Sequence, residues 1–309
     1  MARTGSADGV NITRRRRGLG SSMSRRTLLY AIPALAFYLF AVLVPTTQGA
    51  TYAFTDWNGL SKSFSFVGFE NIVDVLSDPT SFKALTNTLV IAVVFTVVQN
   101  IIGLALALGV NSKIKSRNVL KVLIFAPAVM TPVVIGYLWQ YMLAPEGPVN
   151  NALDGLGLGN LKQVWLGEPN LALGSIIFVL IWQFSGYSMV IFLAGLQGVP
   201  EELIEASAVD GAGPFRRFWS IVLPLLAPAV TINVMLSMIG ALKIFDQVWI
   251  LTGGGPGGTT HTLSTLMFRE AFTYGDFGKS IALGLVLLII VAAISLVQYR
   301  ALITREGRN

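Results

Sequence analysis

The sequence of 309 residues contains no cysteine and a single histidine, His261. Without cysteine the chain forms no disulfide and offers no thiolate as a nucleophile or metal ligand. A lone histidine in a loop is far more often an ordinary residue than a ligand. No nucleophile and base are arranged as an enzyme requires. These absences argue against a catalytic or metal-binding role for the chain.

Charge is also scarce, because only 12% of the residues are charged while 53% are hydrophobic. A soluble domain carries about 25% charged residues. The formal net charge of +6 is compatible with a nucleic-acid partner in principle. The basic residues, however, cluster at the ends of long apolar runs. That distribution indicates a polytopic membrane protein.

Long apolar runs occur six times, and each is near the ~20 residues that a bilayer requires. They predict membrane helices at about 28–49, 84–110, 119–143, 171–197, 223–245 and 280–300. We therefore expect an all-α membrane domain over 28–303, with a cytoplasmic tail at 304–309. The segment 1–27, rich in Gly, Ser and Arg, predicts a disordered basic tail. The alternative of a cleaved signal peptide is disfavoured, because no clear small-x-small cleavage site follows the first run.

Lys and Arg predict the orientation of these helices. With the N-terminus in the cytoplasm, most of the 22 basic residues fall in the tail, the second-to-third connection, the 200–224 loop and the C-terminus. The few others fall on the outer side or in the outer half of a span. The sequence thus predicts that both termini and the 200–224 loop lie in the cytoplasm. The longer connections at 50–83, 144–170 and 246–279 are then external.

Acidic residues are nearly absent from the apolar runs. Proton-coupled carriers place Asp, Glu or His within the membrane to bind the proton, so this absence counts against secondary transport. The chain also shows no internal repeat of the kind common in such carriers. A glycine run at 253–258 is followed by Thr259 and Thr260 without a lysine, which rules out a P-loop and nucleotide binding by this chain.

Neutral polar residues do occur in the runs. Such residues either join helices by hydrogen bonds or line a path for a neutral, hydroxyl-rich solute. Gln183 and Tyr187, four residues apart, share a helix face, and Trp182 precedes them. Lys243 lies toward the outer end of its run, where an ion pair with Asp246 is the alternative to a solute contact. The full set is Asn87, Thr88, Gln99, Asn100, Thr131, Gln140, Trp182, Gln183, Ser185, Tyr187, Ser188, Asn233 and Ser237.

The stretch 200–224 is a polar interruption that has the signals of ordered structure. Pro200 is suited to the first turn of a helix, where no amide hydrogen is needed. Gly211 suits a helix end in the left-handed conformation. Pro214 is suited to start a second short helix. A helix–turn–helix at the membrane surface is therefore expected, although an ordinary amphipathic interfacial helix is an alternative.

This stretch resembles the "EAA loop" of permeases from binding-protein-dependent ABC importers. The family pattern is Glu-Ala-Ala, three residues, Gly, nine residues, Ile, one residue, then Leu-Pro. The chain has Glu205-Ala206-Ser207, Gly211, Ile221 and Leu223-Pro224 at that spacing, with Ser207 as the one departure. The turn Thr252-Gly253-Gly254-Gly255-Pro256 also resembles one that often follows the fifth helix in this family.

The resemblance implies a type I importer permease in the cell membrane, with a coupling helix docked on a cytoplasmic ATPase dimer. It also implies a second permease subunit and an extracytoplasmic binding protein. ATP and Mg would be bound by the ATPase, and this chain would hold no cofactor or metal. The implied coupling residues are Glu201, Glu202, Glu205, Ala206, Ser207, Asp210, Gly211, Ile221, Leu223 and Pro224.

Further matches, including Phe66–Asn71, Leu193–Gln197 and Lys243-x-Phe245-Asp246, are similar to the carbohydrate-uptake subfamily of maltose and glycerol-3-phosphate type. In that subfamily the helices that flank the coupling loop contact the solute. This implies a sugar pathway along the chain. Its expected residues are Gln183, Tyr187 and Ser237, together with Trp182 and Lys243. Gly240 and Ala241, one turn further, are small and apolar, which leaves the sugar itself open.

Two alternatives fit the composition. A secondary transporter would use an ion gradient and need no ATPase, and a membrane scaffold would use the 200–224 loop to recruit some other cytoplasmic protein.

Overall fold

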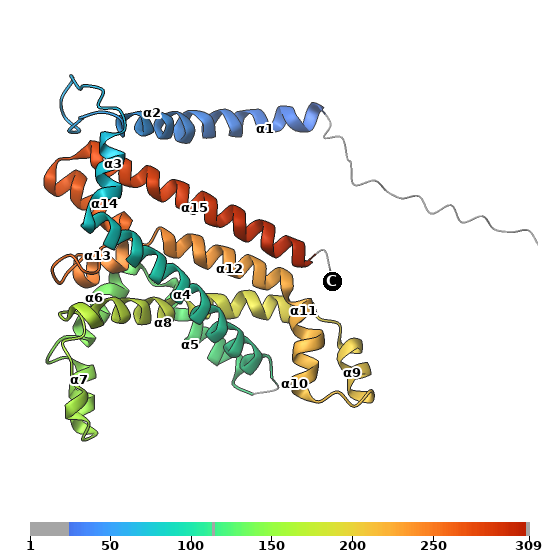
Figure 1. The fold of residues 1–309 in the computed structure, drawn as a ribbon. Helices are drawn as coiled ribbons and strands as arrows, with labels where there is room; N and C mark the ends of the chain where they lie inside the picture. Colours follow the sequence, from blue (N-terminus) through green and yellow to red (C-terminus); the bar gives the residue numbers. More distant parts are fainter. Residues whose placement is uncertain (1–24, 113–114, 307–309) are drawn as a thin grey trace, which may run out of the picture. The chain divides into compact units, whose positions relative to one another are not determined.

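The computed structural model describes residues 25–112 and 115–306, and the part described contains α-helices, short π- and 3₁₀-helical segments, and no β-strand (Figure 1). The predicted basic tail lies outside these residues up to position 24. The chain divides into two units, residues 1–48 and 49–309, which we describe separately. The predicted all-helical fold class is confirmed.

The first unit contains α1 (Arg25–Tyr38), a π-helical segment (Leu39–Leu43) and the start of α2 (Val44–Tyr52). Pro45 cannot donate an amide hydrogen bond, and the helix just before it is widened to the π form. Residues Tyr30–Tyr52 are apolar and long enough to cross a membrane.

In the second unit, three further helices are long and apolar enough to span a membrane: α4 (Pro79–Asn111), α8 (Pro169–Gln197) and α15 (Phe277–Glu306). Asp78 caps α4, because its carboxylate accepts hydrogen bonds from the amides of Thr80 and Ser81 at 3.1 and 3.2 Å. The helix α15 continues through Glu306, so the predicted tail at 304–309 begins inside a helix, and residues 307–309 lie outside the described part.

Two predicted spans are bent pairs of helices. The run 119–143 is α5 (Arg117–Val129) and α6 (Pro132–Met142), which meet at 98°. Thr131 precedes Pro132 and is extended, since a proline disfavours the helical conformation of the residue before it. The run 223–245 starts with the last residues of Pro214–Leu225, which meets α12 (Ala227–Leu242) at 69°. Neither bend was predicted from the sequence. The described part therefore has four spans, or up to six if each bent pair crosses the membrane.

Small residues let the long helices approach closely. A Cβ atom on Gly103 of α4 would lie 2.3 Å from the Ser188 side chain of α8. A Cβ atom on Gly186 of α8 would lie 2.2 Å from the Ile124 carbonyl oxygen of α5. Close backbone approach of this kind is typical of helix packing in membranes.

The connections predicted to be external loops are partly helical. They hold α3 (Glu70–Ser77), α7 (Pro148–Gly155), α13 (Asp246–Thr252) and α14 (Leu263–Arg269), followed by a π-helical segment, Glu270–Tyr274. A short 3₁₀ segment, Gly159–Leu161, lies between α7 and α8. At the other end of the bundle are α9 (Glu201–Val209), α10 (Pro214–Arg217), a π-helical segment (Phe218–Val222) and α11 (Leu223–Leu225).

Candidate functional site

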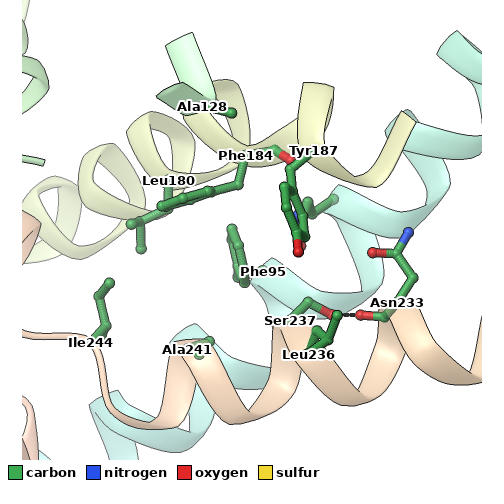
Figure 2. Close-up of a pocket in the computed structure, with 12 residues that line it drawn as sticks. Phe95, Ala128, Leu180, Phe184, Tyr187, Asn233, Leu236, Ser237, Ala241 and Ile244 are labelled. Carbon is green, nitrogen blue, oxygen red and sulfur yellow. Dashed lines mark hydrogen bonds between the residues drawn. The ribbon is translucent and has the colours of Figure 1, made fainter. Parts of the chain in front are cut away.

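A cavity of about 360 Å³ lies between α4, α5, α8 and α12. Three aromatic rings line it, those of Phe95, Phe184 and Tyr187. The polar lining comes from Gln99, Asn233, Ser237 and the Tyr187 hydroxyl, and none of the described residues that line it is charged. Figure 2 shows the Tyr187 ring from α8 facing Ser237 and Asn233 of α12 across this space. The cavity thus combines aromatic and aliphatic side chains with a few neutral polar groups.

Hydrogen bonds between helices hold the polar side of the cavity. Asn100 of α4 donates from Nδ2 to the Ser237 hydroxyl oxygen at 3.0 Å. The Ser237 hydroxyl donates to the Asn233 carbonyl oxygen at 2.8 Å. The Ser188 hydroxyl of α8 donates to Asn233 Oδ1 at 3.1 Å. Asn233 and Ser237 are therefore held in place by α4 and α8 before any solute arrives.

Two side-chain amide oxygens near this wall have no hydrogen-bond donor. Gln99 donates from Nε2 to the Phe184 carbonyl oxygen at 2.9 Å, and Asn100 donates from Nδ2 to the Thr96 carbonyl oxygen at 2.7 Å. A carbonyl oxygen can only accept, so these bonds fix which way each amide faces. Gln99 Oε1 and Asn100 Oδ1 are then left buried without a partner among the described residues. Such acceptors favour a ligand or water that donates hydrogen bonds.

The five predicted solute residues do not share this cavity. Tyr187 and Ser237 line it, whereas Gln183 is fully buried behind it. Gln183 donates to the Met130 carbonyl oxygen, at the break between α5 and α6, and accepts from Gln247 Nε2 at 2.9 Å. Gln183 is therefore tied into the protein interior.

Trp182 and Lys243 lie elsewhere. The Trp182 ring packs edge-on against Trp139, with centroids 5.3 Å apart. Lys243 lines a separate cavity of about 460 Å³ with Phe245, Phe268 and other residues. The alternative ion pair is absent, since among the described residues Lys243 and Asp246 are not within salt-bridge distance. A solute contact by either side chain stays a prediction.

The rings of Phe95 and Phe184 were not anticipated as part of a site. They lie in apolar runs where aromatic residues are common, so periodicity gives no sign that they face a cavity. Gln99 and Asn233 were marked as polar within the membrane, but the sequence did not show which of the neutral polar residues gather at one place.

The 200–224 loop forms the expected helix–turn–helix. The helix α9 ends at Val209 and is followed by Asp210 and Gly211, and the φ of Gly211 is +74°, left-handed as predicted. The Gly211 amide donates to the Ala208 carbonyl oxygen, and the Ala212 amide donates to the Ser207 carbonyl oxygen at 2.9 Å. These two bonds make a Schellman motif, which satisfies the last carbonyl groups of the helix. Pro200 caps α9 and does not lie inside it, because the helix begins at Glu201.

The coupling residues predicted on α9 are mostly accessible. Those exposed are Glu201, Glu202, Glu205, Ala206, Asp210 and Gly211. Ser207 is buried, and its hydroxyl donates to the Ile204 carbonyl oxygen at 2.7 Å. Ile221, Leu223 and Pro224 are half-buried in the helix that leads back to α12. Their surfaces are thus largely occupied by the protein itself, unlike those on α9.

The connection between α13 and α14 is fastened to α4. Asn87 donates from Nδ2 to the carbonyl oxygens of Thr259 and His261, at 2.7 and 2.9 Å. The Thr88 hydroxyl oxygen accepts from the Leu263 amide at 2.9 Å. These two polar residues in the N-terminal part of α4 therefore hold this loop in place.

His261 is buried in the same loop. Arg269 Nη1 donates to His261 Nε2 at 3.0 Å. Burial, and after it the positive charge of Arg269, lowers the pKa of His261 from 6.5 to about 4. The imidazole is therefore neutral near pH 7, which agrees with its acceptor role. Among the described residues no group of His, Asp and Glu is arranged to hold a metal ion.

Several membrane-length helices around a solute-sized, uncharged cavity define a multi-pass membrane transport subunit. The family described as "Binding-protein-dependent transport system inner membrane component" matches residues 99–304, and the chain belongs to it. It is therefore a membrane-spanning permease subunit of a binding-protein-dependent ABC importer. The secondary-transporter and scaffold alternatives are set aside.

Relatives match along nearly their whole length. The "Probable ABC transporter permease protein YurN" of Bacillus subtilis is 36% identical over 275 residues, covering 88% of this chain and 94% of that protein. The "Multiple sugar-binding transport system permease protein MsmF" of Streptococcus mutans is 35% identical over 256 residues, covering 83% and 88%. A chain of a bacterial ABC transporter involved in import of the acidic polysaccharide alginate has the same fold, with a TM-score of 0.79 and 23% identity, covering 91% and 96%.

Proposed function

We propose that this permease carries a neutral mono- or oligosaccharide through the cavity between α8 and α12. The observation that carries the proposal is the lining, in which three aromatic rings share one uncharged cavity with neutral hydroxyl and amide groups. Aromatic faces suit the C–H surfaces of sugars, and hydroxyl and amide groups suit their hydroxyls. The similarity to MsmF, a permease protein of a multiple sugar-binding transport system, supports the same class of solute.

The partners we propose are a second permease subunit, a pair of cytoplasmic ATPases and an extracytoplasmic binding protein. The related alginate transporter has been seen in complex with a periplasmic protein bound to an alginate pentasaccharide. ATP and Mg would be held by the ATPases. The exposed acidic and small residues of α9, with Gly211 at its end, would form the docking surface.

In this mechanism, ATP closes the ATPase dimer and moves α9 as a rigid element. The helices then tilt to open the cavity outward, where the binding protein releases the sugar. Hydrolysis returns the pathway to the inward-open form.

The test is a pull-down of the tagged chain from mild detergent, followed by uptake of labelled neutral oligosaccharides in cells that lack and regain the chain. We expect an ATPase to co-purify and uptake to stop on ATP depletion. Uptake that collapses with the ion gradient while ATP is present would overturn the proposal.

A further inference from the structure

The second half of the 200–224 loop differs from α9 in both direction and surface. We call Pro214–Leu225 the return helix; it is the helical run α10, the π-helical segment Phe218–Val222, and α11. It meets α12 at 69°. In Figure 1, α10 runs across the end of the bundle, while α8 and α12 run along it. A helix at that angle to a membrane span lies closer to the membrane plane than to the membrane normal.

The depth of the return helix follows from this angle. An α-helix rises about 1.5 Å per residue, so a helix bent by 69° advances only about 0.5 Å per residue along the α12 axis. Measured from Leu226, Trp219 is then displaced by about 4 Å and Phe215 by about 6 Å along that axis. The polar layer on each side of a bilayer is about 5–8 Å thick. With α12 along the membrane normal and Leu226 at the edge of the hydrocarbon core, both residues fall within the headgroup layer.

The outer surface of the return helix is aromatic and basic. Phe215 is 77% exposed and Trp219 is 54% exposed, and their ring centroids lie 6.0 Å apart, one helical turn from each other. Arg216, beside them, is exposed. The opposite side packs on the protein, where Val222 contacts the buried cluster that includes Leu226. Tryptophan and arginine at the edge of a membrane are typical of interfacial anchors.

The two halves of the loop carry opposite charge. The exposed side chains of α9 include Glu201, Glu202 and Glu205, and α9 has no basic residue. The return helix carries Arg216 and Arg217 and no acidic residue. An anionic membrane surface attracts basic segments and repels acidic ones. The positive charge of the return helix therefore favours contact with anionic lipid. The negative charge of α9 disfavours that contact, so α9 stays accessible to a partner in the aqueous phase.

We propose that the return helix is an interfacial anchor, with Phe215 and Trp219 inserted among the headgroups and Arg216 on anionic lipid phosphates of the same membrane leaflet. The anchor sets the height at which α9 is presented to its partner. This role does not depend on which solute is carried.

The absence of cysteine from the sequence makes the test direct, because single cysteines can be labelled with a nitroxide without background. We would label Phe215→Cys and Trp219→Cys in nanodiscs of phosphatidylcholine and phosphatidylglycerol. The matched control is Val209→Cys, which is 88% exposed on α9. Collision rates with oxygen, which partitions into lipid, and with a water-soluble nickel chelate report the surroundings of each label.

At positions 215 and 219 we expect oxygen collisions to exceed nickel collisions by at least about twofold, with the reverse at 209. Labels at 215 and 219 as open to nickel as the label at 209 would overturn the proposal. It would equally be overturned if these labels became protected only after the ATPase was added, since the face would then belong to the ATPase.

The lipid charge is tested separately with Arg216→Gln in the Trp219→Cys background. We expect removal of phosphatidylglycerol to lower the oxygen-to-nickel ratio at position 219 when Arg216 is present, and to change it little in the variant. A ratio that does not respond to lipid charge in either protein would remove the anionic lipid from the proposal.

Discussion

The cavity wall and the 200–224 loop both bury polar side chains and expose apolar ones, but the two regions face different surroundings. Around the cavity, the polar Asn233 and Ser188 are buried together with apolar side chains such as Leu180, while the apolar Leu236 is exposed. In the loop, the polar Ser207 is buried, while Val209 and Phe215 are among the most exposed apolar residues of the described part. In the membrane the surrounding solvent is apolar, so exposed apolar groups need no partner there. In the loop they do need one, which is why exposure carries functional information at that end of the protein.

The largest effect is expected from a change that damages the loop without touching the cavity. Gly211→Pro removes the amide that bonds to the Ala208 carbonyl oxygen and cannot adopt a φ of +74°. We expect uptake to fall at least about tenfold while the subunit still inserts in the membrane, because the end of α9 is displaced. Uptake assays and membrane fractionation measure the two quantities.

Alanine substitutions at two nearby glycines separate the effect of backbone conformation from the effect of an added side chain. A Cβ atom meets nothing within 4 Å at either Gly211 or Gly213, and only Gly211 has a positive φ. Gly211→Ala should therefore weaken uptake and Gly213→Ala should not. Equal effects of the two would show that the left-handed turn is unimportant for coupling.

Ala206→Trp and Tyr187→Ala sharpen the comparison between the two regions. Both positions are exposed, so neither change should lower stability by more than about 0.5 kcal/mol. Ala206→Trp should abolish retention of the ATPase in a pull-down, because a bulky side chain blocks close docking. Tyr187→Ala should leave the ATPase bound and reduce uptake several-fold. Loss of ATPase binding in Tyr187→Ala would contradict the separation of the two sites.

A smaller effect is expected at the loop between α13 and α14. Asn87→Leu leaves the carbonyl oxygens of Thr259 and His261 without their donor and should cost about 2 kcal/mol of folding free energy. Thermal unfolding in detergent measures this loss. The neighbouring exposed Thr86, replaced by Ala, is the control and should unfold near the wild-type temperature.

The smallest expected effect depends on pH. The pKa of His261 is lowered to about 4 in the folded chain, from 6.5, so as pH falls the unfolded chain takes up the proton first. The stabilisation from the neutral imidazole is full above pH 6.5 and is lost as pH falls from 6.5 toward 4. Between pH 7.5 and 5.5 this amounts to about 1 kcal/mol. The free energy of unfolding of His261→Gln should lack this pH-dependent contribution. If its pH dependence equals that of the wild type, the contribution does not come from His261.

Local features were predictable from the sequence, and features set by neighbouring helices were not. The left-handed end of α9 follows from Gly211 alone, since few other residues adopt that conformation. The break before Pro132 was missed, because hydropathy measures the length of an apolar run and not its direction. Gln183 and Tyr187 share a helix face in sequence terms, yet one is sealed behind the cavity and the other lines it. Their difference depends on where Gln247 and Met130 lie, which no local pattern encodes.

The bend at Leu226 also determines how a movement of α9 would be passed to the cavity. Leu226, at the bend between the return helix and α12, is fully buried in a packed cluster, so we take it as a fixed point about which the two helices would turn together. The arm from Leu226 to Pro214 is about 18 Å long, and the arm from Leu226 to Ser237 is about 16 Å. With arms of nearly equal length, a displacement of 1 Å at the α9 end would produce a displacement of about 1 Å at the cavity wall. A small displacement of a partner bound at α9 would then reach the cavity wall with about the same amplitude.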